Sequence, residues 1–165
     1  MNAVADTSPL IHFAAAGILP ALAGLLGRVH VPPVVRDELV VLKPEAPEVR
    51  ALHGALVTWL QVVELTPLGQ AEAARLGRDV DVGEAGVIAL ALQLDADLVV
   101  MDDQAGRRAA RRRGLTVIGT AGLLVEAKKA GLVPAVAPFM AIMRDHGLWI
   151  SDDLVAEVLA RAGEG

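Results

Sequence analysis

The stretch LVVMDD, residues 98–103, decides the fold class of this 165-residue chain. Four apolar residues run without interruption up to two aspartates, which is typical of a strand buried on both faces of a parallel sheet. Residues 2–5 (NAVA) form a second short apolar run, and Asp6 ends it. We therefore predict two buried strands that each end at acidic side chains.

The rest of the chain alternates short strand candidates with helical patterns. Further strand candidates cover residues 28–31, 56–65 and 116–118, and helical patterns cover residues 34–42, 70–76 and 84–94. After residues 2–5 we expect a helix that Ser8 caps, with Pro9 in its first turn. Strands that alternate with helices favour a parallel sheet. We therefore predict an α/β fold, a three-layer αβα sandwich with a roughly five-stranded parallel sheet.

The C-terminal part shows no strand signal after Pro134 and is predicted to be helical. Ser151 is expected to cap the last helix, along which the apolar residues form one stripe: Leu154, Val155, Val158, Leu159 and Ala162. A length of 165 residues fits about one domain. We predict that residues 1–165 form a single domain in which residues 134–165 are a helical extension. This extension either covers the domain as a lid or forms an oligomerisation surface.

Composition limits the chemistry that the chain can use. It is 54% hydrophobic but 2% aromatic, which argues against aromatic platforms for base stacking. There is no cysteine, so a metal must be held by oxygen or imidazole. The four histidines show no close metal-ligand spacing, and we expect them to be structural. The sequence shows neither a membrane-spanning run nor a basic N-terminal leader, so we expect a cytoplasmic protein with no membrane contact.

The charge is unevenly distributed. The net charge of -5 argues against bulk attraction to nucleic acid. However, five of the 12 arginines fall within residues 107–113. Our candidates for contacts with RNA phosphates are Arg107, Arg108 and Arg111. A solvated helix face is the alternative interpretation of this cluster.

Acidic side chains follow two of the predicted strands. Asp6 ends the first strand, and Asp102 and Asp103 end the strand at residues 98–101. Sites in parallel α/β sheets form beyond the carboxyl ends of the strands. The alternatives are a turn or capping role for Asp6, and a capping role for one of the two adjacent aspartates.

Two glutamates are expected to face the same site. Glu38 shares its helical spacing with apolar residues such as Val35 and Val41, although it could instead be a rim residue whose carboxylate reaches water. Glu84 points inward near a helix start, and Asp81-x-x-Glu84 also matches a capping box. Several carboxylates brought together repel one another unless a hard cation neutralises them. The pattern therefore predicts Mg²⁺ or Mn²⁺ and metal-assisted hydrolysis of a phosphodiester.

These residues also resemble a known family. The motifs, in chain order, are Asp6-Thr-Ser-Pro-Leu10, Pro33-x-x-x-x-Glu38-Leu39, Asp81-x-Gly-Glu84 and Asp102-Asp103-x-x-x-Arg107. They resemble the PIN-like domains, above all a prokaryotic branch related to the VapC-type toxins. The ending, Gly147-Leu-Trp-Ile-Ser151 and Ala162-Gly-Glu164, resembles that branch too.

The resemblance implies a divalent-metal ribonuclease with an acidic pocket and frequent dimerisation. It matches Asp6, Glu38, Glu84 and Asp103 to the family's four acidic positions, which we take as catalytic. Our predicted metal ligands are Asp6, Glu84, Asp102 and Asp103. Ser8 matches a hydroxyl position that supports the metal site. Glu84 departs from the aspartate usual among VapC-like toxins, and Asp102 departs from the usual Thr-x-Asp pattern.

The leading hypothesis is an endoribonuclease, the toxin of a pair that a neighbouring antitoxin protein restrains. One alternative is a non-catalytic PIN-like module that binds nucleic acid or protein. Another is a receiver-like or phosphatase-like domain with Asp6 as phosphoacceptor. The second aspartate of a phosphatase D-x-D motif is absent, however, because Ser8 stands there.

Overall fold

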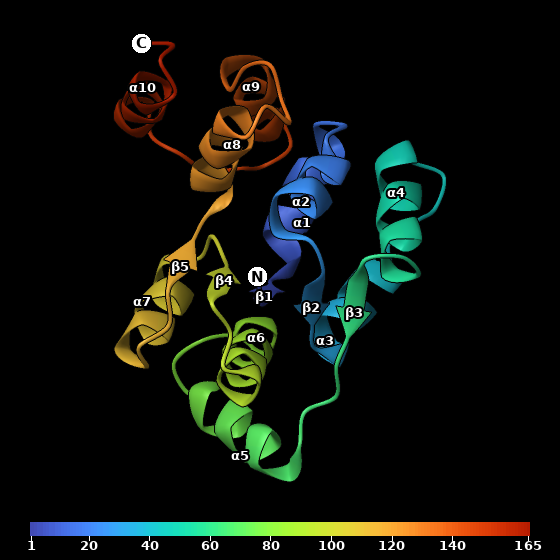
Figure 1. The fold of residues 1–165 in the computed structure, drawn as a ribbon. Helices are drawn as coiled ribbons and strands as arrows, with labels where there is room; N and C mark the ends of the chain where they lie inside the picture. The colour runs from blue at the N-terminus through green and yellow to red at the C-terminus, as the bar shows by residue number, and fades with distance from the viewer.

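The computed structural model describes residues 1–165 and contains one five-stranded sheet surrounded by ten helices (Figure 1). The strands are β1 (Ala3–Ala5), β2 (Val29–Val31), β3 (Leu60–Val62), β4 (Leu98–Val100) and β5 (Val117–Ile118). All neighbouring strands pair in parallel, in the order β3-β2-β1-β4-β5. The predicted α/β fold with a five-stranded parallel sheet is confirmed.

The helices form the two outer layers. They are α1 (Thr7–Ala15), α2 (Leu19–Leu26), α3 (Pro33–Val40), α4 (Pro47–Leu56), α5 (Pro67–Leu76), α6 (Val82–Leu94), α7 (Gln104–Arg112), α8 (Thr120–Lys129), α9 (Ala137–Asp145) and α10 (Asp152–Arg161). In Figure 1, α5 and α6 lie below the sheet, whereas α1, α2 and α8 lie above it. None of these helices combines the length and the apolar character that a membrane span requires.

The core depends on small side chains as well as on leucine and valine. All residues of α6 from Gly83 to Ala91 are buried, and α6 contacts both β1 and β4. A Cβ atom at Gly86 would lie 2.8 Å from Cγ1 of Val34, so this glycine allows α6 and α3 to pack closely. This packing brings the start of α6 next to the helix that carries Glu38.

The strand predicted at residues 56–65 was wrong at both ends. Only Leu60–Val62 is extended, and Leu56 is the last residue of α4. Pro47 stands in the first turn of α4, where the backbone N–H that proline lacks would have had no partner within the helix. The helix buries Leu52 and Ala55. The β-branched residues of the segment did not distinguish the helix end from the strand.

The C-terminal helix begins and ends at specific contacts. Oγ of Ser151 accepts a hydrogen bond from the N–H of Leu154 at 3.2 Å, so the predicted cap of α10 is confirmed. Val158 is buried against the rest of the chain, and α10 packs on α8. Leu154, which we had placed in the same stripe, is instead 43% exposed. Within this chain the extension packs on its own domain, and oligomerisation stays a prediction.

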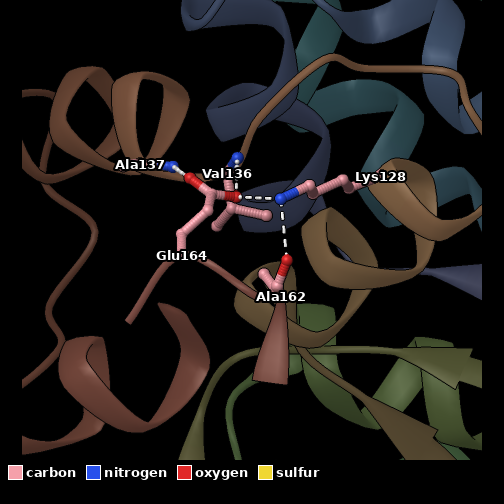
Figure 2. Close-up of polar contacts among 5 residues, drawn as sticks. All are labelled: Lys128, Val136, Ala137, Ala162 and Glu164. Carbon is pink, nitrogen blue, oxygen red and sulfur yellow. Dashed lines mark hydrogen bonds and ion pairs between the residues drawn. The ribbon is translucent and has the colours of Figure 1, made fainter. Parts of the chain in front are cut away.

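Glu164 fastens the end of the chain to α8 and α9 (Figure 2). Its Oε2 accepts hydrogen bonds from Nζ of Lys128 at 2.9 Å and from the N–H of Val136 at 2.8 Å, and its Oε1 accepts one from the N–H of Ala137 at 3.0 Å. Lys128 also donates to the carbonyl oxygen of Ala162 at 2.7 Å. The bonds from Ala137, Lys128 and Val136 lower the pKa of Glu164 to about 2. Glu164 thereby occupies the free N–H groups at the start of α9.

Candidate active site

The sheet order creates a crevice between β1 and β4. From these two central strands the chain proceeds in opposite directions, to β2 and β3 on one side and to β5 on the other. Such a switch point leaves a crevice at the carboxyl ends of the strands, which is where ligands bind in open α/β sheets. Asp6 follows β1 and Asp102 follows β4, and the N–H of Asp6 donates to the carbonyl oxygen of Val100 at 2.9 Å.

A pocket of about 850 Å³ opens at this edge, and the predicted acidic residues all line it. Six carboxylates face it, and no lysine or arginine does: Asp6, Glu38, Asp81, Glu84, Asp102 and Asp103. Helices α3 and α6 contribute Glu38 and Glu84, so the two glutamates come from other segments of the chain than Asp6 and Asp102, which follow the central strands. The structure therefore brings together every acidic residue singled out in the sequence and adds Asp81.

Asp6 caps α1, and the prediction that Ser8 does so was wrong. Oδ1 of Asp6 accepts a hydrogen bond from the N–H of Thr7 at 2.8 Å, and α1 begins at Thr7. Pro9 is therefore the third helical residue, where its missing N–H still costs no helical bond. Ser8 lines the pocket and its hydroxyl has no hydrogen bond within the chain.

The surroundings of Asp6 disfavour the ionised form of its carboxylate. It is 8% exposed, and burial raises its pKa to about 6, although the Thr7 N–H opposes this shift. The nearby charges of Glu38, Asp81 and Asp102 raise it further. A buried carboxylate among other carboxylates lacks the positive partner that would keep it ionised.

Glu84 both caps α6 and faces the pocket. Oδ1 of Asp81 accepts from the N–H of Glu84 at 2.8 Å, and Oε2 of Glu84 accepts from the N–H of Asp81 at 3.1 Å, which completes the capping box. Burial raises the pKa of Glu84 to about 7, and the charges of Asp81, Asp103 and Asp6 act in the same direction. Glu84 therefore fits both interpretations, because it completes the capping box and also lines the pocket.

Glu38 does not lie on an inward stripe, so that prediction was wrong. The buried positions of α3 are Val35 and Leu39, whereas Val41 is 78% exposed and Glu38 itself is exposed. Glu38 is the rim residue of the alternative interpretation, and its Oε2 accepts a hydrogen bond from Oγ1 of Thr7. It nevertheless lines the mouth of the acidic pocket.

The two adjacent aspartates have different partners. Oδ2 of Asp103 accepts from the N–H of Gly106 at 2.8 Å and so caps α7. Asp102 accepts from the N–H of Thr120 at 2.7 Å and from its Oγ1 at 2.6 Å. Burial raises the pKa of Asp102, but the nearby His12 and the hydrogen bonds from Thr120 outweigh it and lower the pKa overall. Asp102 therefore uses both oxygens within the protein, and Asp103 uses one.

The carboxylate oxygens that receive no hydrogen bond are the type of ligand that a hard divalent cation prefers. Asp6 Oδ2, Glu84 Oε1 and Asp103 Oδ1 receive no hydrogen bond, because each carboxylate is held through its other oxygen. Magnesium and manganese prefer such oxygen ligands, and no lysine or arginine lines the pocket to neutralise the carboxylates. In the structure as it stands, no three acidic or histidine side chains form a group that could hold an ion. Metal binding therefore stays a prediction.

His12 is the site residue that the sequence analysis missed. It is 7% exposed, it lines the pocket, and its Nδ1 lies 3.4 Å from Oδ2 of Asp102. It follows Ser8 by four residues in α1, and this spacing places both on one helix face. No signal near His12 in the sequence indicates its approach to Asp102, which lies in a distant segment. The other histidines bond to backbone carbonyl oxygens: His30, His53 and His146.

The three arginines proposed for phosphate binding do not all line the same pocket. Arg107 is half-buried and lines a second pocket of about 340 Å³, which shares Asp102 and Gln104 with the acidic pocket. Arg108 and Arg111 are exposed and line neither pocket. Burial and the nearby charge of Arg111 lower the pKa of Arg107. The second pocket also includes Arg161, which no sequence motif indicated.

Comparison with known proteins agrees with the geometry. A family model described as a PIN domain, DUF3368, matches residues 2–164. No curated protein matches the chain. The match spans nearly the whole chain and includes every residue of the acidic pocket. The chain therefore belongs to the DUF3368 family of PIN domains and has a fold of the nuclease type.

Proposed function

We propose that this chain is a divalent-metal-dependent endoribonuclease that hydrolyses phosphodiester bonds. The observation that carries the proposal is the set of unpartnered carboxylate oxygens in one pocket that no lysine or arginine lines. Its position at the switch point of a PIN-domain sheet supports it.

The carboxylates have different roles in this proposal. Asp6, Glu84 and Asp103 hold Mg²⁺ or Mn²⁺ through the oxygens that receive no hydrogen bond. An ion bound there would supply an activated water and withdraw charge from the scissile phosphate. Glu38, exposed at the pocket mouth, is placed to accept a proton at Oε1. Asp102 is left out of the ligand set, because both its oxygens are bonded within the chain.

The electrostatics make substrate binding depend on the metal. A pocket of six carboxylates repels an RNA phosphate until cations neutralise part of its charge. Arg107 lies beside that pocket and offers a guanidinium to a neighbouring phosphate, with Arg108 and Arg111 further along the same helix. Ser8 supports the site with a hydroxyl that has no partner in the chain.

RNA as the substrate, and the role of a cytoplasmic toxin, are proposed from the motif resemblance. So are the homodimer and the antitoxin protein that would restrain the enzyme. Induction of the chain should arrest growth and degrade cellular RNA, and co-expression of a gene encoded beside it should relieve the arrest. Light scattering of the purified protein tests the dimer. Growth that continues with intact RNA would refute the toxin role without touching the metal site.

The central experiment is cleavage of mixed pools of single-stranded RNA and DNA by the purified protein with Mn²⁺. We expect RNA cleavage that EDTA abolishes. The variants Asp6→Asn and Asp103→Asn should lose about 100-fold or more, because even residues behind metal ligands typically contribute about 10- to 100-fold. The matched control is Asp79→Asn, an exposed carboxylate outside the pocket. Cleavage in EDTA, or equal activity of all three variants, would refute the mechanism.

A second candidate is a non-catalytic module that binds nucleic acid or protein. It is favoured by the capping bonds of Asp6, Glu84 and Asp103 and by the lack of a ready ligand group. Calorimetric titration with Mn²⁺ separates the two candidates. Saturable binding that Asp6→Asn weakens supports the nuclease, whereas no binding heat supports the module.

A further inference from the structure

Trp149 is displayed to solvent from a loop that is itself fixed. Trp149 is 89% exposed, while its neighbours Leu148 and Ile150 are only 8% and 7% exposed. Nη2 of Arg144 donates to the carbonyl oxygen of Ile150 at 2.9 Å, and the N–H of Leu148 donates to that of Met143 at 2.9 Å. A large aromatic side chain held outward in this way has no partner inside the protein, which is a reason to look for an external one.

The position of Trp149 points to what that partner is. The residue lines both the acidic pocket and the second pocket, and Leu154 does the same. The second pocket contains Arg107 and Arg161, and neither guanidinium forms an ion pair with a carboxylate. Nε of Arg107 is also buried without a hydrogen-bond partner. An exposed indole thus stands between a carboxylate-lined pocket and a pocket with two unpaired arginines.

We infer that the second pocket and Trp149 together form a nucleotide subsite for single-stranded RNA. This inference rests on the proposed function and names the form of its substrate. Trp149 stacks on an unpaired base next to the scissile bond, and Arg107 holds the adjoining phosphate, with Arg161 at the rim of the pocket. A base in a duplex has both faces covered by its neighbours, so the subsite selects a single strand.

This subsite changes one expectation from composition. The low aromatic content argued against a stacking platform, but one indole in the right place is enough for one base. Trp149 belongs to the segment 146–151, which connects α9 to α10. The Glu164 contacts in Figure 2 hold the other end of α10 against α8 and α9, so both ends of the helix that follows the loop are fixed.

Fluorescence gives a direct test, because the chain has two tryptophans. Trp59 is half-buried beside β3, far from the pocket residues in the sheet order. The double variant Trp59→Phe, Glu38→Gln leaves Trp149 as the sole indole, keeps the three carboxylates proposed to hold the metal and slows cleavage of the RNA, and it is studied with Mn²⁺ present. We titrate it with a short single-stranded RNA, with an abasic strand of equal phosphate number, and with the duplex. Saturable quenching by the base-bearing single strand alone is the expected result.

Affinity and kinetics give the matching measurements. Trp149→Ala should weaken RNA binding by about 5- to 100-fold, the range for stacking of one base, while Trp149→Phe should keep most of the affinity. In the otherwise unmodified enzyme, Trp149→Ala should raise KM with little change in kcat. Arg161→Ala should weaken the RNA and the abasic strand alike, because it removes a charge and not a platform.

The outcomes separate the subsite from the proposed function. Base-dependent quenching without any cleavage by the unmodified protein would refute the nuclease and retain the subsite. Cleavage with an unchanged KM in Trp149→Ala, or equal quenching by the abasic strand or the duplex, would overturn the subsite. Circular dichroism of Trp149→Ala should match the parent, because the indole it removes is exposed.

Discussion

Replacing Asp6 with asparagine should stabilise the metal-free protein at neutral pH while it lowers cleavage by about 100-fold or more. The amide oxygen of asparagine can still accept the N–H of Thr7, so the α1 cap remains. What disappears is a buried negative charge whose pKa is raised to about 6 by burial and then by the charges of Glu38 and Asp81. The fold would thus hold the carboxylates of the pocket close together despite their mutual repulsion.

The sign and size follow from proton linkage. An acid with a higher pKa in the folded than in the unfolded chain binds its proton more tightly when folded. Its ionisation therefore costs stability, and the cost grows as pH rises from the ordinary value of 3.8 through about 6. At about 1.4 kcal/mol per pH unit, the complete cost of ionising Asp6 is up to about 3 kcal/mol. Glu84, whose pKa is raised to about 7, adds a cost of the same sign at higher pH.

Urea unfolding in EDTA, followed by circular dichroism at about pH 5 and about pH 7.5, measures this effect. The unmodified protein should be less stable at the higher pH, and Asp6→Asn should be the more stable of the two there, with a flatter pH profile. Asp79→Asn should follow the unmodified protein within about 0.5 kcal/mol. Adding Mg²⁺ should stabilise the unmodified protein and stabilise Asp6→Asn less at the same concentration. Lower stability of Asp6→Asn at about pH 7.5 would refute the reasoning.

Three further substitutions test other parts of the structure. Gly83→Ala should lower cleavage by about 10-fold or more without loss of urea stability, because its Cβ would lie 2.8 Å from Oε1 of Glu38 and displace it; unchanged kcat would show that cleavage does not require Glu38 Oε1 at this position. Asp102→Asn should lower the unfolding free energy by about 1–3 kcal/mol, because an acceptor of two Thr120 hydrogen bonds is impaired; equal stability would contradict that role. The pKa of Glu164 is lowered, so its contribution to the free energy of unfolding is present above about pH 4.5 and is lost as pH falls towards about 2. Acid titration of Glu164→Gln should lack that loss, and an identical acid limb would show that the contacts do not matter.

The sheet and its acidic edge could be predicted because the signal was local. The run LVVM before Asp102 and the run NAVA before Asp6 each contain a buried strand and its carboxyl end within a few residues. Helix starts were harder where two signals compete. In the segment 44–47, Pro44 suggests an end, yet Pro47 stands in the first turn of α4. In the segment 6–9, both Asp6 and Ser8 can cap, and Pro9 is compatible with either helix start, so the hydrogen bond from the Thr7 N–H to Asp6 identifies the cap only in the structure.

The parts of the site that were missed depend on contacts between distant segments. Thr120 meets Asp102 because β5 lies beside β4, and nothing near either residue indicates that pairing. Trp149 reaches the pocket only through the packing of α9 and α10 on the rest of the chain. Glu38 is exposed because α3 packs through Val35 and Leu39, which are the buried positions of this helix. Periodicity gives the spacing of a helix but not its rotation against its neighbours.

The acidic pocket is also the place where four helices begin. Asp6, Asp81 and Asp103 cap α1, α6 and α7, and Asp102 bonds to the first N–H of α8. Each helix start carries a partial positive charge of about half a unit, which offsets part of the repulsion among the carboxylates. One oxygen of each capping residue thus stabilises the fold, and the other stays without a hydrogen bond. Alanine substitutions would remove both functions together, because they remove both oxygens. Asparagine keeps an oxygen for the cap and removes the charge, so it separates the part of each carboxylate that holds the fold from the part that would hold the metal.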